Sequence, residues 1–407
     1  MIDQSTKPRI LIIGDAVANT GFAKVIFEIF SPMKDKYELV QLGTNYFGDP
    51  HNWPWKIFPA GIDAYKLGEH RIRKLVEGFR PSLIFMLQDP WALIAYMQEL
   101  TAFPAIPTIV YASFNSEEID PAVLPPLSRA RRLIVYTQFA KHAIDDLLKK
   151  DPSLNLPEIE VIPHGVNTAV FRPLDDKKNT SQEIARKKLY PADNEALQNG
   201  FIVLNANRNQ PRKRIDLTME GFSLFAKYKP PNIFLHLHMG LKDLGWDLHY
   251  LARKFQLEDR LIYSTTLSEH PNLQENSLNT IFNAADVGIN TASSEGWGLL
   301  SFEQAAAGLP QIVPDHSSGR ELWKDCAYLL PYEITLTNPH SMIAEHIIHP
   351  EAIASALQDA WNDREELINR RQLCYANATK KEYAWPLISS QWEQLFDREM
   401  QRIAAQE

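Results

Sequence analysis

The sequence predicts an α/β fold built from two doubly wound, parallel-sheet domains. Short apolar runs alternate with segments of helical periodicity along most of the chain. The alternation stops at a polar stretch, residues 172–199, and then starts again. Strands that alternate with helices form right-handed βαβ units, which build parallel sheets. The length of 407 residues suits two to three domains of roughly 150 residues each.

The first series opens at residues 9–14, "RILIIG", a short apolar run of the kind that forms a buried parallel strand. Its predicted strands are 9–14, 37–43, 81–89, 108–113 and 132–137, and its predicted helices are 22–33, 71–79, 91–100 and 139–150.

The second series follows residues 172–199, which we interpret as a connection ending in an amphipathic helix. Its predicted strands are 201–207, 233–240, 261–265 and 287–290, and its predicted helices are 216–228, 248–255 and 278–285. We place one domain at residues 1–170, a second at 171–383 and a final helix at 384–407. Ligands of doubly wound sheets bind at the carboxyl ends of the strands, so two such domains are expected to face a cleft.

The composition limits the classes of function. Hydrophobic residues make up 45% and charged residues 23%, which is ordinary for a soluble globular protein. The net charge of −8 disfavours a nucleic-acid partner held by an overall positive field, although a local basic patch stays open. Two cysteines, Cys326 and Cys374, suit a reducing compartment. No run of eighteen apolar residues occurs, so we expect a cytoplasmic protein.

The loop after the first strand, residues 14–25, carries Gly14 and Gly21. Gly21 stands just ahead of a predicted helix, whose amides and dipole can receive an anion. The spacing is not G-x-G-x-x-G, which disfavours a nicotinamide dinucleotide. A plain strand-to-helix turn is an equal alternative.

The loop after the strand 201–207 is basic. It holds Arg208, Arg212, Lys213 and Arg214. Arg208 and Lys213 follow a buried strand, where unpaired positive charges are costly unless an anion joins them. A diphosphate is the natural anion for such a pair, whereas Arg212 and Arg214 are equally well explained as solvated.

The stretch "SSEGWGLLSFEQAAAGLP", residues 293–310, places Glu295 before a glycine-rich turn and Glu303 on the helix that follows. Gly296 and Gly298 allow a ligand close to the backbone, and Gly308 suits the end of the helix. Because a carboxylate offers only acceptors, two such groups suit a polyhydroxylated ligand.

This stretch resembles the E-x7-E signature of the retaining glycosyltransferases of family 4, which have the GT-B fold. Further segments fall in that family's order: 162–173 is similar to its interdomain segment, "NRNQPRKR" to its diphosphate loop, "YTQFAKHAI" to the last helix of its first domain, "SGRELW" to its glycine-glutamate turn, and "YAWPLISSQWEQLF" to the helix that crosses back to the first domain.

The resemblance implies roles for these residues. Arg208 and Lys213 would neutralise the donor diphosphate, Glu295 would contact the donor sugar, and Glu303 the ribose. The backbone at Gly296 and Gly298, with the amides of Leu299, Leu300 and Gly21, would line the phosphates and sugar. The chain has no Asp-x-Asp motif, so we expect neither a metal nor a cofactor, and the nucleotide-diphosphate sugar is a substrate.

Several residues depart from the family pattern. His164 and Asn167 replace an asparagine and an aspartate, and Asn207 replaces a glycine. In the loop after 108–113, Asn115 or a neighbour stands where the family often has a histidine. Asp89 would orient an acceptor hydroxyl or, as we slightly prefer, cap the next helix.

The acceptor is less defined. Residues 45–55, "NYFGDPHNWPW", are rich in aromatics that suit sugars or bases, but a packed loop is at least as good an interpretation. Six basic residues leave open a peripheral contact with the inner face of a membrane, and solvated helix faces explain them as well: Arg71, Arg73, Lys74, Arg129, Arg131 and Arg132. We favour a cell-surface saccharide or a lipid-linked sugar as acceptor, with a modified viral DNA base as the minor option.

Two alternatives stay open. A sugar-nucleotide 2-epimerase also uses two Rossmann-like domains but needs no second substrate. A non-catalytic nucleotide-binding protein of the same fold would not hydrolyse the donor.

Overall fold

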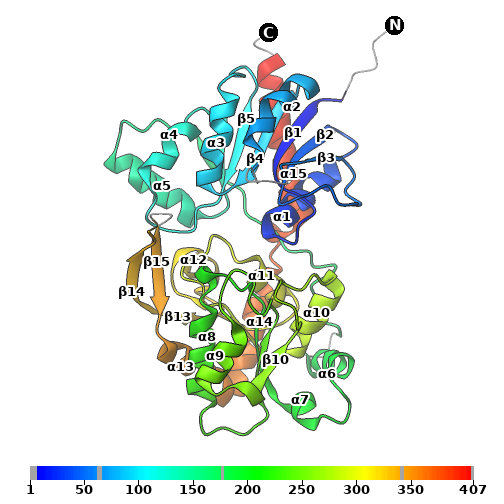
Figure 1. Cartoon of the computed structure of the whole chain (residues 1–407), viewed down its shortest axis with the longest axis vertical. Helices are drawn as coiled ribbons and strands as arrows, with labels where there is room; N and C mark the ends of the chain where they lie inside the picture. The colour runs from blue at the N-terminus through cyan, green and yellow to red at the C-terminus, as the bar shows by residue number, and fades with distance from the viewer. Residues whose placement is uncertain (1–6, 62–66, 176–177, 340–342, 405–407) are drawn as a thin grey trace. The chain divides into compact units, whose positions relative to one another are not determined.

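The computed structural model (Figure 1) describes residues 7–61, 67–175, 178–339 and 343–404. The chain divides into two compact units. Unit 1 comprises Met1–Gly165 together with Trp385–Glu407, and unit 2 comprises Val166–Ala384. Each unit has its own parallel sheet, and the two are described separately below.

The sheet of unit 1 is parallel, in the order β3-β2-β1-β4-β5-β6-β7. Its central strands are fully buried, which explains their continuous apolar runs. The strands are β1 Arg9–Asp15, β2 Glu38–Thr44, β3 Lys56–Pro59, β4 Leu83–Gln88, β5 Thr108–Ala112, β6 Arg132–Val135 and β7 Ile159–Val161.

The helices of unit 1 lie between these strands in the sequence, except for α15, which follows unit 2. They are α1 Gly21–Phe30, α2 Ile72–Phe79, α3 Pro90–Leu100, α4 Leu124–Leu127, α5 Gln138–Lys150 and α15 Trp385–Ala404. Thr20 caps α1 by accepting a hydrogen bond from the Ala23 amide at 3.2 Å. Gly14 has φ +156, and a Cβ there would lie 2.8 Å from the Leu87 carbonyl oxygen, so the close approach of β1 to β4 requires glycine.

Helix α15 belongs to unit 1 although it ends the chain. Its Trp392 and Phe396 are buried, and their rings contact Phe85 with centroids 5.2 Å and 6.1 Å away. Glu399 on the same helix is buried between Arg131 and Arg132, with contacts of 2.8 Å and 2.9 Å. Arg132, a candidate surface cation, is therefore part of a buried ion-pair network.

The sheet of unit 2 is also parallel, in the order β10-β9-β8-β11-β12-β13. Its strands are β8 Phe201–Asn205, β9 Ile233–Leu237, β10 Leu261–Tyr263, β11 Val287–Ile289, β12 Gln311–Pro314 and β13 Tyr328–Leu330. Its helices are α6 Lys178–Leu189, α7 Glu195–Asn199, α8 Ile215–Ala226, α9 Leu248–Phe255, α10 Glu275–Ala284, α11 Leu299–Ala306, α12 Ser317–Trp323, α13 Pro350–Asn362 and α14 Arg364–Ala378.

The predicted pattern of two doubly wound parallel sheets is confirmed. Several elements were not predicted. Among them are the strands β3, β7, β12 and β13, the helices α13 and α14, and an antiparallel hairpin of β14 Tyr332–Thr337 with β15 Ala344–Ile348. β3 and β7 are the two edge strands of their sheet, and at four and three residues they are too short for a clear pattern.

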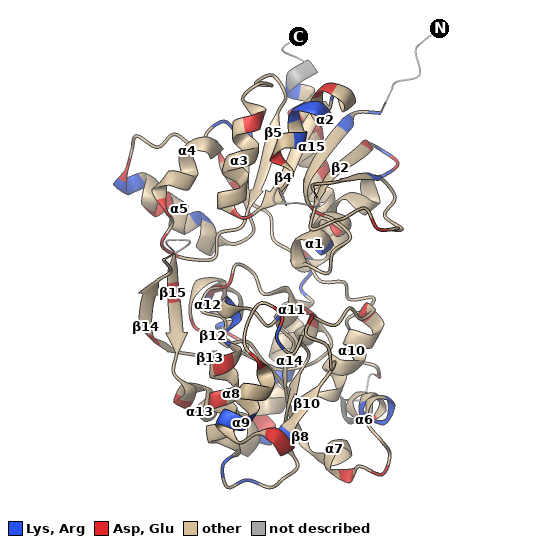
Figure 2. Ribbon diagram, in the orientation of Figure 1, with Lys and Arg blue, Asp and Glu red and all other residues tan. Residues whose placement is uncertain are grey.

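Two further findings concern the surface. Within the described residues, no helix has the length and apolar character needed to cross a membrane. Figure 2 shows Lys and Arg together with Asp and Glu on outward helices such as α6 and α9, as expected for solvated faces.

Candidate functional site

The candidate site of unit 2 lies where the strand order reverses. β8 is the first strand of this sheet, and its neighbours are β9 on one side and β11 on the other. In doubly wound sheets the connections leave in opposite directions at such a switch point, and ligands bind at the carboxyl ends of these strands. The loop after β8 carries the basic cluster, and the loop after β11 carries Glu295.

Lys213 and Glu295 meet at this switch point. The Lys213 ammonium donates a hydrogen bond to Glu295 Oε2, across 82 residues of sequence. Both side chains are only 12% exposed. Two hydrogen bonds hold the two loops together. The Ser293 amide donates to the Arg212 carbonyl at 2.8 Å, and the side-chain hydroxyl of Thr291 donates to the Lys213 carbonyl at 3.1 Å.

The two groups titrate far from their ordinary values. Burial lowers the pKa of Lys213 to about 8, although the charge of Glu295 acts in the opposite direction. Burial alone would raise the pKa of Glu295, but the charges of Lys213 and Arg212 outweigh it and lower this pKa to about 2. Glu295 is therefore a carboxylate at neutral pH, and Lys213 is a cation close to its titration point.

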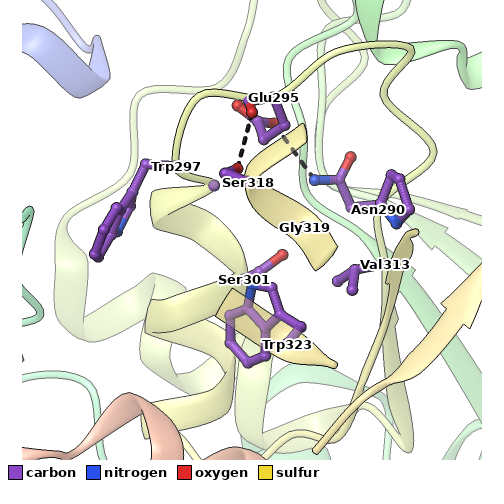
Figure 3. Close-up of a pocket in the computed structure, with 10 residues that line it drawn as sticks. Asn290, Glu295, Trp297, Ser301, Val313, Ser318, Gly319 and Trp323 are labelled. Atoms are coloured by element: carbon purple, nitrogen blue, oxygen red, sulfur yellow. Dashed lines mark hydrogen bonds between the residues drawn. The ribbon is translucent and has the colours of Figure 1, made fainter. Parts of the chain in front are cut away.

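The loop of Glu295 is fixed from two further directions (Figure 3). Asn290 Nδ2 donates to Glu295 Oε2 at 3.4 Å, and Ser318 Oγ donates to the Glu295 backbone carbonyl at 2.8 Å. Glu295 and Ser318 also line a small pocket, together with Trp297, of about 10 Å³. That volume holds roughly one water molecule, so this pocket is too small to accept a sugar by itself.

Arg208 differs from the sequence-based expectation. The sequence predicts a ligand diphosphate as its partner, but Nε and Nη2 bind the protein's own Asp243 at 2.7 Å and 3.1 Å. Asp243 follows β9, the neighbour of β8, and is 7% exposed, whereas the Arg208 side chain is 40% exposed. Because a guanidinium has five donors and only two are used here, the pair keeps donors for an anion.

The other two cations of the basic loop also have protein partners. Arg214 binds its neighbour Asp216 at 3.0 Å and 2.7 Å. Arg212 donates to the Ser294 carbonyl and lies 3.6 Å from Glu295 Oε1. Arg212 therefore belongs to the site, while the structure gives Arg214 only a local partner.

Helix α11 begins beside Glu295. Gly298 stands at its N-cap position with φ +85, and Leu299 and Leu300 are its first two residues. Gly296 is buried in the turn before them. Glu303, which is buried, is the fifth residue of the helix. It lies about one turn from the start of the helix, because residues 295–298 are not helical.

The candidates of unit 1 lie at the carboxyl ends of its strands. Gly21 is the first residue of α1, and Asn115 follows β5 in a half-buried position. Asp89 occupies the N-cap position of α3, but its side chain makes no capping hydrogen bond. The preference for a capping role of this side chain was therefore wrong. His164 is buried beside Tyr111 and Tyr136, and burial lowers its pKa to about 3.

Sequence reasoning missed several site residues. Asn290 and Asp243 are unremarkable in sequence, and Ser318 lies in the motif SGRELW but was not assigned a role. Asn290 reaches Glu295 within one loop, whereas the order of the strands brings Asp243 to Arg208. His238, which follows β9, was also missed. It is buried, neither ring nitrogen has a hydrogen-bond partner among the described residues, and burial lowers its pKa to about 3.

Comparisons with known proteins add the following. No protein-family model matches the chain. It is 27% identical over 178 residues to a mannosylfructose-phosphate synthase of Agrobacterium fabrum, which is 42% of this chain and 36% of that protein. It is 27% identical over 195 residues to a D-inositol 3-phosphate glycosyltransferase of Acidothermus cellulolyticus, which is 46% of this chain and 39% of that protein. The chain thus matches less than half the length of these curated relatives.

Solved structures match over almost the whole chain. Sucrose-phosphate synthase of Thermosynechococcus elongatus has a TM-score of 0.72 at 17% identity, covering 98% of this chain and 100% of that one. HepE of Anabaena, solved with UDP-glucose, has a TM-score of 0.68 at 15% identity, covering 96% and 99%. The fold is GT-B. The fold agrees with the one expected from the sequence, and the proteins named here include two sugar-phosphate synthases and a glycosyltransferase.

Proposed function

We propose that this protein is a retaining glycosyltransferase of family 4 that moves a sugar from a nucleotide-diphosphate sugar to an acceptor hydroxyl. The observation that carries the proposal is the buried Lys213–Glu295 pair at the switch point of unit 2, with Arg208 in the same loop as Lys213. Solved neighbours were obtained with UDP and with UDP-glucose, which makes uracil the first base to test.

Each residue has a role that its chemistry supports. A lysine ammonium has three donors, so Lys213 can keep Glu295 and also bind a phosphate oxygen. Arg208 would supply the remaining positive charge on the diphosphate. Glu295, a carboxylate with a pKa of about 2, can only accept hydrogen bonds, as the hydroxyls of a sugar require. Glu303 would hold the ribose, and Gly21, Gly296, Gly298, Leu299 and Leu300 would present backbone to the ligand.

In the proposed reaction, the bond between the sugar C1 and the phosphate oxygen breaks, and its electron pair stays on the phosphate. The acceptor oxygen forms the new bond to C1 on the same face. Its proton passes to the leaving phosphate oxygen, so no protein nucleophile is needed. Lys213 and Arg208 stabilise the charge that develops on the phosphate, and Glu295 stabilises the cationic character of the sugar.

We propose that this reaction requires no metal ion, since side-chain cations lie where charge develops. Turnover should then survive a chelator. Loss of turnover in chelator that Mn²⁺ or Mg²⁺ restores would contradict this part of the proposal. A cell-surface saccharide or lipid-linked sugar is the proposed acceptor class, with the enzyme at the inner face of the membrane and Asp89 and Asn115 on the acceptor side.

The comparisons do not favour the two alternatives. The named relatives are synthases and glycosyltransferases, and none is named as an epimerase or a binding protein. Donor hydrolysis, together with a requirement for an acceptor, would distinguish the proposed enzyme from both.

The experiment is thermal stabilisation of the full chain by nucleoside diphosphates and nucleotide sugars in the presence of EDTA. One nucleotide family should stabilise the protein, by about 2.7 kcal/mol at 100 times the dissociation constant. The shift should disappear in Arg208→Ala and in Glu303→Ala. It should persist in Arg253→Ala, a matched control that removes an exposed arginine from α9 of the same unit. If no nucleotide stabilises the protein against heat, the proposed donor site is wrong.

A further inference from the structure

The two cysteines of the chain lie together in unit 2. Cys326 follows the end of α12, and Cys374 lies on α14, 48 residues further along the sequence. The Cys374 thiol donates a hydrogen bond to the Cys326 carbonyl at 3.3 Å, and the two thiol groups also hydrogen-bond to each other. Since the chain has two cysteines in all, a disulfide within one molecule can only join these two residues.

Packing alone does not explain a cysteine at both positions. Cys374 is fully buried on the inner face of α14, in line with Leu367 and Ala378, and Cys326 is 5% exposed. Small apolar side chains fill positions of this kind equally well, so what distinguishes a cysteine there is the reactivity of its thiol.

The surroundings make the two thiols unequal. The hydrogen bond from Cys374, with the charges of Lys380 and Arg370, lowers the pKa of Cys326 against the opposing effect of burial. The same hydrogen bond, together with burial, raises the pKa of Cys374. Because the thiolate is the reactive form of cysteine, Cys326 is suited to attack an oxidant, and Cys374 is suited to react with the product.

A pocket gives a small oxidant a path toward the pair. Its volume is about 440 Å³, and Lys324, Ala327 and Arg370 are among the residues that line it. Lys324 and Ala327 stand on either side of Cys326 in the sequence. Arg370 lies one turn before Cys374 on α14, and its Nη1 donates to the Ala327 carbonyl at 3.1 Å. The pocket therefore lies where α14 meets the segment of Cys326.

We propose that Cys326 and Cys374 are preset to form a reversible disulfide with hydrogen peroxide as the oxidant. The Cys326 thiolate attacks one oxygen of the peroxide, the O–O bond breaks, and hydroxide departs, so that Cys326 becomes a sulfenic acid. The Cys374 sulfur then bonds to the Cys326 sulfur, the S–O bond breaks, and the hydroxyl group leaves with the Cys374 thiol proton as water. In total the two thiols lose two electrons, and the peroxide is reduced to two water molecules.

The cross-link joins the end of α12 to α14. Asn377 Nδ2 on α14 donates to the carbonyl of Leu322 on α12 at 2.9 Å, so the two helices are already in contact before oxidation. A disulfide that closes a long loop stabilises the folded chain mainly by restricting the unfolded one. The oxidised chain should therefore unfold at a higher temperature than the reduced chain.

The experiment treats the full, reduced chain with a small excess of hydrogen peroxide. The intact mass should fall by about 2 Da as both thiols disappear, peptide mapping should find Cys326 linked to Cys374, and dithiothreitol should reverse the change. The rate should not depend on protein concentration, because the reaction takes place within one molecule. The midpoint of thermal unfolding should rise on oxidation and return on reduction.

Serine variants assign the two roles. In Cys374→Ser, peroxide should leave a sulfenic acid on Cys326 that dimedone traps, and in Cys326→Ser the remaining thiol should react about tenfold more slowly. The matched control is the double variant Cys326→Ser/Cys374→Ser, which reports the effect of peroxide on methionine alone. If a serine variant does not fold, labelling of the unmodified chain with iodoacetamide gives the same comparison, with Cys326 about tenfold faster than Cys374.

Several results would overturn the inference. They are a disulfide between two molecules as the main product, a sulfinic acid on Cys326 without the disulfide, persistence of both thiols in peroxide, faster reaction of Cys374, and a lower unfolding temperature of the oxidised chain. None of these measurements uses a nucleotide, so their outcome is independent of the proposed donor site.

Discussion

At the carboxyl ends of β8 and β11, one lysine and one carboxylate are buried together. Each is only 12% exposed, so neither charge is well solvated. The pair resolves the cost of burial by placing opposite charges in contact, and Arg212 and Asn290 add further donors around Glu295. Because the pair is buried, a change at either residue should affect the stability of the fold, the pKa of the partner and the binding of a ligand.

The first prediction concerns this coupling. Lys213→Met should lower the free energy of unfolding on the order of 3 kcal/mol, because it leaves Glu295 buried without its main partner. The double variant Lys213→Met/Glu295→Gln should recover a large part of the loss, because it removes both charges. Urea unfolding of Lys213→Met, of Glu295→Gln and of the double variant measures the coupling between the two residues. Additive losses would show that the pair contributes nothing as a pair.

The second prediction concerns pH. The pKa of Lys213 is about 8 in the folded chain, below its ordinary 10.5. Between pH 8 and pH 10.5, Lys213 binds more protons in the unfolded chain than in the folded chain. Its contribution to the free energy of unfolding therefore rises with pH across that range. Diphosphate binding has the opposite dependence, because it needs the charged ammonium. The dissociation constant of the nucleoside diphosphate should therefore rise above pH 8, by up to tenfold per pH unit.

Calorimetric titration between pH 6.5 and pH 9.5 measures this dependence. Lys213→Arg is the matched control, since a guanidinium keeps its charge over the whole range. Its binding should be nearly independent of pH. A flat profile in the unmodified chain would mean that Lys213 does not contact the diphosphate.

At the scale of elements, the turn before α11 shows how backbone conformation sets up the site. Gly298 has φ +85, and a Cβ there would make only ordinary contact with Glu295 Cγ at 3.6 Å. The space would accept a side chain, whereas the backbone conformation would not. Glycine is therefore required by dihedral angle, and the start of α11 depends on it.

The third prediction compares two glycines. Gly298→Ala should lower the free energy of unfolding by about 1–2 kcal/mol, because an L-residue is strained in the left-handed region. It should also weaken donor binding by moving the first amides of α11. Gly78→Ala, on α2, should raise stability by about 0.5–1 kcal/mol, because a Cβ there meets nothing within 4 Å. Thermal unfolding of both variants checks the opposite signs.

The elements also show why some secondary structure was predicted and some was missed. Long buried strands such as β1 and β4 carry continuous apolar runs, and those runs predicted them. The hairpin β14–β15 is mostly exposed on β14, and Ile334 and Leu336 there are 46% and 51% exposed. The sequence of β14, YEITLT, alternates apolar with polar residues, so this strand could have been predicted from the pattern and was missed. Its pairing is decided by tertiary context.

At the scale of the whole molecule, the chain is two separately cored units, and the last helix belongs to the first. Trp392 is fully buried against Phe85 and Tyr111, at ring distances of 5.2 Å and 4.8 Å. Removal of this side chain should therefore destabilise unit 1, although Trp392 is more than 200 positions away from the first segment of that unit, which ends at Gly165.

The fourth prediction follows. Trp392→Ala should destabilise unit 1 by about 3–5 kcal/mol, because it leaves a cavity in the core. Amide hydrogen exchange should rise in the strands of unit 1, residues 9–15 and 83–88, and stay unchanged in those of unit 2, residues 201–205 and 287–289. Leu387→Ala, at a partly exposed position of the same helix, is the control. Equal acceleration in both sheets would mean that the two units unfold together.

The sequence by itself determined the class of fold and the positions of most elements, because buried strands and amphipathic helices have characteristic periods. It also located the charged candidates, since Glu295 and Lys213 stand in loops after strands. Only the tertiary structure decided which side chains meet. Lys213 with Glu295, Arg208 with Asp243 and Asp15 with Gln88 are pairs of residues that follow or end neighbouring strands, and strand order is a property of the assembled sheet. Local pattern specifies what each segment is, whereas non-local packing specifies its partners.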